Sequence, residues 1–165
     1  MGVEITFTAD VGALTGYLDG MRGQMREAIR RGVVEQTGAL RRYIKQEKLS
    51  GQVLKTRTGN LRNAVFDRVD DQGAVIVGTV SVDPSAQKYA RAHEFGAHIP
   101  ERVPVNAKAL RWYLNGAPVF AMRARAFDLP VRSFMRSSLT EMSGSILAAL
   151  REKLNEQMSE AVSGS

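Results

Sequence analysis

The chain has 165 residues, and 23 Lys and Arg against 17 Asp and Glu give it a formal charge of +6. Its 44% hydrophobic residues are typical of a globular domain that buries a core, which excludes wholesale disorder. Without cysteine it has no disulfide, thiolate metal site or cysteine nucleophile, and no apolar run approaches the roughly 20 residues of a membrane span. We expect one soluble domain over 1–165 that is not exported.

The charge alternates along the chain. Residues 22–68 carry a net +8 and residues 102–136 a net +6, whereas 1–21, 69–101 and 137–165 sum to −3, −3 and −2. This pattern favours contact with nucleic acid, with an acidic partner or between copies of the chain.

The first half of the sequence predicts a strand and a long helix. Alternation of Val3, Ile5 and Phe7 with polar residues predicts a strand over 1–9. Helical spacing predicts a helix over 11–48, with one apolar stripe made of Leu14, Leu18, Met21, Met25, Ile29, Val33, Leu40 and Ile44. Such a helix would be about 57 Å long, more than the roughly 40 Å diameter of a compact domain of this size. We therefore expect it to overhang the body or to break near Gly20–Gly23.

Residues 64–127 predict two hairpins with a short helix between them. The first hairpin joins Val65–Val69 to Ala74–Val82 through a turn at 70–73. The short helix covers Ala86–Glu94 and is closed by Gly96.

The second predicted hairpin joins Leu110–Leu114 to Val119–Phe127 through a turn at 115–118. Residues 132–158 predict a C-terminal helix, and 159–165 a fraying tail. The apolar stripe of that helix is Leu139, Met142, Ile146, Leu150, Leu154 and Met158. The predicted fold class is α+β, with one antiparallel sheet of about four to five strands packed with both long helices.

No catalytic or metal-binding constellation stands out. His93 and His98 are five residues apart with Gly96 between them, whereas a zinc-protease helix needs histidines four apart on one continuous helix. No nucleophile elbow and no phosphate-binding glycine loop occurs. We expect no enzymatic activity, no metal and no cofactor.

Five basic side chains fall within about 100° of arc beside the apolar stripe of the long helix. These are Arg26, Arg30, Arg41, Lys45 and Lys48. The functional interpretation is a surface that contacts phosphates or an acidic protein, which makes a small basic DNA-binding protein one candidate function. The alternative is an ordinary solvated helix surface.

Short motifs in the rest of the chain carry a family resemblance. They are Thr56–Asn63, Val77–Thr79, Tyr89–Ala90, Glu94–Gly96 and Pro130–Met135. In this order and spacing, over roughly residues 50–155, the chain resembles the neck or tail-completion proteins of long-tailed bacteriophages, the minor tail protein Z-like group. It departs from them at Ser133, where the family often has proline, and in 97–126, which is longer than expected.

The resemblance implies a structural virion protein that is assembled in the cytoplasm of the bacterial host. It would form a ring, sixfold, that completes the tail and joins it to the head connector, with neck, tail-terminator or tail-tube proteins as neighbours. DNA would be present only as channel contents, and no membrane is involved. Arg57, Arg62 and Glu94 are expected to supply charge pairs within or between subunits, and Phe95 and Phe134 to anchor loops to the core.

Overall fold

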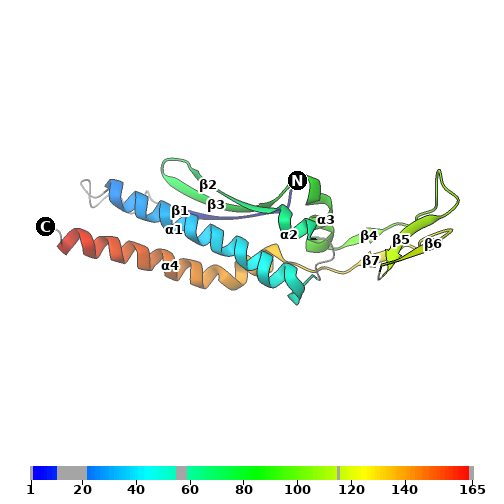
Figure 1. The fold of residues 1–165 in the computed structure, drawn as a ribbon. Coiled ribbons are helices and arrows are strands. Elements are labelled where there is room, and N and C mark those ends of the chain that lie inside the picture. Colours follow the sequence, from blue (N-terminus) through cyan, green and yellow to red (C-terminus); the bar gives the residue numbers. More distant parts are fainter. Residues whose placement is uncertain (1, 11–21, 55–58, 115, 164–165) are drawn as a thin grey trace.

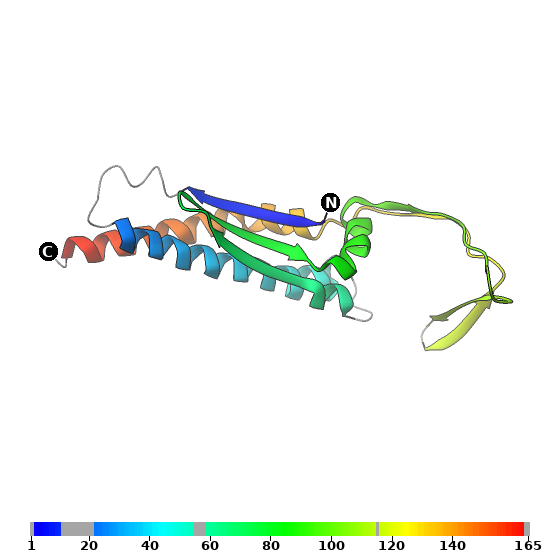
Figure 2. The same ribbon diagram turned by 90° about the horizontal axis from the view of Figure 1, so that it is seen from above.

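The computed structural model describes residues 2–10, 22–54, 59–114 and 116–163. It is an α+β structure in which a three-stranded sheet covers two long helices, and a thin β-structured arm projects from one end (Figures 1 and 2). The long helices are α1 (Arg22–Tyr43) and α4 (Met135–Ser163), which run antiparallel side by side (Figure 1). The α+β class is therefore confirmed.

The sheet consists of β1 (Glu4–Asp10), β2 (Val65–Asp71) and β3 (Val75–Val82), in the order β1-β3-β2 with both pairings antiparallel. The N-terminal strand and the first hairpin are confirmed. Its turn holds Gly73 at a φ of 81°, a conformation that favours glycine.

The predicted long helix is confirmed over 22–48. After α1 the chain continues as the π-helix η2 (Ile44–Gln52), which Gly51 kinks with a φ of 137°. The remainder of the prediction, 11–21 with most of the expected break, lies outside the described residues. Two further helices follow, α2 (Asn60–Ala64) and the predicted short helix as α3 (Pro84–Phe95).

The core lies between the helices and the sheet. The described part of the α1 stripe is buried as predicted, from Met25 to Ile44. Near the arm, Leu40 and Ile44 pack with Val80, Val82 and residues at the start of α4. Toward the other end, a second cluster of Ile29, Val33 and Ile76 packs against side chains of α4 and the sheet.

Two glycines in the long helices provide a matched stability test. A Cβ at Gly144 of α4 would meet nothing within 4 Å, so Gly144→Ala is expected to raise the free energy of unfolding by up to about 1 kcal/mol. A Cβ at Gly32 of α1 would lie 2.9 Å from Leu150 Cδ2, so Gly32→Ala should lose most of that gain. Urea unfolding measures both, and equal gains would contradict the close approach of α1 to α4.

The prediction of one sheet with four to five strands is wrong. The described residues form three separate sheets, because 97–129 leaves the body instead of joining the first hairpin. In this segment, here called the arm, β4 (Ala97–Ile99) pairs with β7 (Phe127–Leu129), and β5 (Leu110–Leu114) pairs with β6 (Ala117–Ala121).

Two boundaries also differ from the prediction. The turn of the second hairpin is shorter than expected, since Ala117 and Pro118 already belong to β6, and its second strand ends at Ala121 instead of Phe127. The expected fraying tail is helical through Ser163, so α4 is longer than 132–158 predicted.

Candidate assembly interface

The arm is a two-stranded extension without a core of its own. Above its β4–β7 base, Arg102 and Ala124 form a bridge, and the β5–β6 hairpin forms the tip. None of its described residues is buried. An isolated two-stranded hairpin is at best marginally stable in water, so contact with another surface would stabilise the arm.

One face of the tip is entirely apolar. Leu110, Trp112 and Leu114 alternate along β5, and their cross-strand partners Ala121, Val119 and Ala117 share that face. Eight large apolar side chains of the arm are exposed, more than half of the fifteen in the described chain. They are Val103, Val105, Trp112, Tyr113, Leu114, Phe120, Met122 and Phe127. Tyr113 and Phe120 lie on the opposite face of the tip from Trp112, so apolar side chains are exposed on both of its faces. Exposed apolar surface gathered on one element is typical of a protein interaction site.

The one charged residue of the two tip strands, Arg111, lies away from that face. Residues 102–127 hold five basic and no acidic side chains. Arg111 is on the opposite face of the tip, with its guanidinium 5.1 Å from the ring centre of Tyr113 and 5.9 Å from that of Phe120. Basic residues on an exposed two-stranded element oppose unspecific strand pairing, and they leave the Trp112 face apolar.

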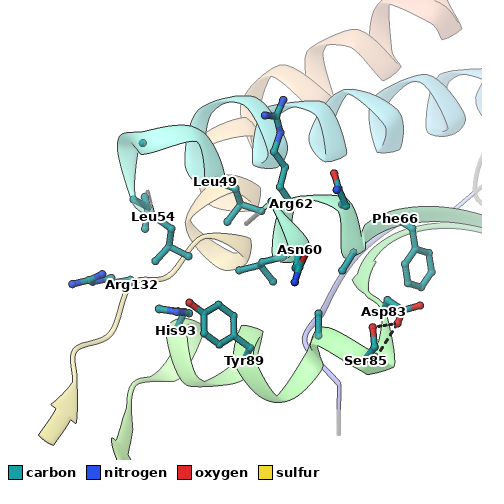
Figure 3. Close-up of a pocket in the computed structure, with 17 residues that line it drawn as sticks. Leu49, Leu54, Asn60, Arg62, Phe66, Asp83, Ser85, Tyr89, His93 and Arg132 are labelled. Atoms are coloured by element: carbon teal, nitrogen blue, oxygen red, sulfur yellow. Dashed lines mark hydrogen bonds between the residues drawn. The ribbon is translucent and has the colours of Figure 1, made fainter. Parts of the chain in front are cut away.

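A cavity of about 1720 Å³ opens on the body where η2, α2 and α3 meet (Figure 3). Its apolar wall includes Leu49, Leu54, Leu61 and Tyr89, and its polar lining includes Arg62, Asp83, His93 and Arg132. Small-molecule sites measure roughly 300–1,000 Å³. This hollow is therefore of a size that admits a segment of another protein.

His93 is one of the residues that line the cavity. Its side chain is buried, and its Nδ1 has no hydrogen-bond partner in the described part of the chain. The ring stands edge-on to Tyr89 with 4.5 Å between the centroids. Burial, with a contribution from Arg132, lowers the pKa of His93 below its ordinary value of 6.5, so the ring is neutral at pH 7 and has one nitrogen that can accept a hydrogen bond.

Glu94 caps α4 from a neighbouring element. Its buried carboxylate accepts hydrogen bonds from the backbone N–H groups of Phe134, Met135 and Arg136 at 2.9, 2.9 and 3.1 Å, and from the Ser133 hydroxyl at 2.6 Å. These donors belong to the first turn of a helix, which has no internal acceptors for them. Two of the motifs that carry the family resemblance, Glu94–Gly96 and Pro130–Met135, are thus joined by one carboxylate.

The structure agrees with some of the other roles expected of the motif residues and differs from others. Phe134 is completely buried, as expected of an anchor, but Phe95 is largely exposed and lies against the Arg136 guanidinium at 5.0 Å, so its anchoring role is wrong. Arg62 is exposed at the cavity. Glu94 pairs with Arg136 at 3.4 Å within the subunit. Arg57 lies outside the described residues.

Most of the basic flank of α1 and η2 is bound to carboxylates of the same chain. Arg26 pairs with Asp71, Arg41 with Asp67 at 2.9 Å, and Arg30 with Glu27 at 3.1 Å. Two of these contacts turn Arg26 and Arg41 toward β2, and all three reduce the positive charge available to phosphates.

The end of the flank contributes to packing. Lys48 is buried and donates to Glu141 of α4 at 2.8 Å. Burial, together with the nearby Arg41, lowers the pKa of Lys45.

Other kinds of site have little support. His98 pairs with Asp128 at 2.7 Å across the base of the arm, apart from buried His93. Across the described ranges, no group of three or more histidine and carboxylate side chains is placed to hold a metal ion. Among the described helices, none is long and apolar enough to span a membrane.

Comparison with known protein families, with curated proteins and with solved structures gave no match.

Proposed function

We propose that this chain is a non-enzymatic structural protein of the bacteriophage virion, a ring subunit at the junction of head connector and tail. In this proposal six copies, assembled in the host cytoplasm, complete the tail around the DNA channel. Their neighbours are other neck, tail-terminator or tail-tube proteins. The observation that carries the proposal is the arm, which exposes eight large apolar side chains and buries none of its described residues.

The residues of the motifs also support this proposal, because they have identifiable roles in holding the fold. Gly59 and Gly96 have φ values of 73° and 76°, which favour glycine, and Glu94 holds the start of α4. The residues that carry the resemblance therefore have defined structural roles in this chain. The resemblance implies assembly in the phage neck, and the arm offers an exposed surface for that assembly.

DNA binding through the α1 flank has less support, because Arg26, Arg30, Arg41 and Lys48 already pair with carboxylates. A DNA-binding protein would lose duplex affinity steeply with added salt. We expect no such salt-dependent binding in gel shifts at physiological ionic strength.

Native mass spectrometry of the purified full chain tests the ring. The expected spectrum shows one closed oligomer of defined stoichiometry, because a head-to-tail contact repeated around an axis closes at a fixed number of copies. A chain that remains monomeric at about 100 μM, far above the μM dissociation constants of even modest interfaces, would refute the proposal.

A further inference from the structure

We infer that the tip of the arm of one copy docks into the η2–α2–α3 cavity of the next copy, with Trp112 entering the cavity beside His93. This inference rests on the proposed ring and adds the contact that closes it. The chain carries both halves of such a contact, an exposed apolar face and a hollow whose described lining includes apolar side chains.

The geometry makes the contact intermolecular. The cavity lies on the body among η2, α2 and α3, whereas the arm carries its tip away from the body (Figures 1 and 2). A tip that does not reach its own cavity leaves the cavity of another copy to receive it. A contact between two different surfaces is heterologous and generates a ring when its rotation closes.

The exposed apolar residues of the tip set the size of the contact. Trp112, Tyr113, Leu114 and Phe120 belong to the β5–β6 hairpin and range from 41% exposed at Trp112 to 62% at Phe120. At roughly 100 Å² for each of the four side chains, the tip would bury about 400 Å² of its own surface, about half of what one partner contributes to a standard interface.

The cavity also offers hydrogen-bond acceptors to the tip. The indole of Trp112 is a hydrogen-bond donor only, and a buried tryptophan usually finds an acceptor for it. The lining includes the Asp83 carboxylate and the Asn60 amide oxygen, each of which can accept from an indole N–H.

A protein occupant fits the tip better than DNA does. The Trp112 face has six apolar residues and no basic one, while Arg111 lies on the other face. A surface that binds phosphates presents its cations to them, so the apolar face requires an apolar counterpart. The cavity wall of Leu49, Leu54, Leu61 and Tyr89 supplies one.

Two complementary variants test the contact. Trp112→Glu disables the arm, and Tyr89→Glu, at a wall residue that is 60% exposed, disables the cavity. Each variant alone is expected to be monomeric in sedimentation velocity, and an equimolar mixture is expected to form one-to-one dimers that grow no further. Leu147→Glu, at a similarly exposed apolar residue of α4, is the control and should assemble like the original chain.

Fluorescence gives a second readout, because Trp112 is the only tryptophan of the chain. Its emission should shift to the blue at the concentrations at which the full chain assembles. Trp112→Phe, which keeps an aromatic ring and removes the indole N–H, should weaken assembly by about 2- to 12-fold.

The outcomes separate the two proposals. Rings that persist in both charged variants, or a Trp112 signal that responds to duplex DNA instead of to chain concentration, would overturn the arm contact and leave the ring intact. An unsubstituted chain that remains monomeric would overturn both.

Discussion

Replacement of Glu94 by Ala is expected to lower the free energy of unfolding by about 3–5 kcal/mol, because three backbone N–H groups and the Ser133 hydroxyl lose their acceptor together. Glu94→Gln should cost less. Oε2 accepts hydrogen bonds from Phe134 and Met135, and Oε1 accepts from Ser133 and Arg136. An amide nitrogen in place of one oxygen therefore leaves the other oxygen to accept from two of the four donors. Urea unfolding of the original chain, Glu94→Gln and Glu94→Ala should give free energies of unfolding that decrease in that order.

The pH dependence of the free energy of unfolding of the same variants shows whether the charged form of Glu94 stabilises the fold. Burial raises the pKa of Glu94, but the hydrogen bonds from Met135, Ser133, Arg136 and Phe134 outweigh it and hold the pKa below the ordinary value of 4.5. A carboxyl whose folded-state pKa is lowered stabilises the protein above its unfolded pKa, and that stability is lost as the pH falls through the folded value. The difference in the free energy of unfolding between the original chain and Glu94→Gln should therefore become smaller as the pH falls below 4.5.

Glu101 provides the matched control. It is exposed at the base of the arm and pairs with Arg123 at 3.6 Å. Surface pairs contribute little, so Glu101→Gln should leave the free energy of unfolding nearly unchanged. If Glu94→Ala were equally silent, the capping role of Glu94 would be excluded.

The second large effect is expected at Gly78, in the middle of β3. A Cβ there would overlap the Thr37 hydroxyl of α1 and lie 2.8 Å from Phe7 Cζ of β1. Thr37 is buried and donates to the Val33 carbonyl at 2.6 Å, so it has little room to move. Overpacking of this kind costs about 1–3 kcal/mol, and Gly78→Ala should reduce stability by about that amount in urea unfolding.

A double variant identifies the clash. Thr37→Ala removes the hydroxyl nearest to the new Cβ, so Gly78→Ala combined with Thr37→Ala should be more stable than the sum of the single effects predicts. Recovery should be partial, because the Phe7 ring remains in place. Strictly additive effects would contradict the close packing of α1 on β3.

The elements of the body could be predicted because their periodicity reflects burial on one face. The α1 stripe from Met25 to Ile44 and the β2–β3 hairpin follow directly from it. The arm has the same alternation of Leu110, Trp112 and Leu114 as a buried strand. Alternation shows which residues share a face and not whether this subunit covers that face, so the second hairpin was wrongly assigned to the main sheet.

The candidate site was harder to predict because its contacts join distant segments. Glu94 was expected to form a charge pair, but its capping of Phe134–Arg136 depends on α3 lying against the start of α4. The basic flank was found from angular position on one helix, and the carboxylates of Asp67 and Asp71 that neutralise much of it come from β2. The Trp112 face and the cavity were missed entirely, although the acid-free run 102–127 gave a signal for the arm.

The proposed neck role is tested most directly by electron microscopy of the particles that the genome encoding this chain produces, prepared with and without the chain. We predict that particles made with the chain carry it as a ring at the head–tail junction, and that its removal leaves heads and tails separate. Joined, DNA-filled particles of normal appearance in its absence would contradict the assignment.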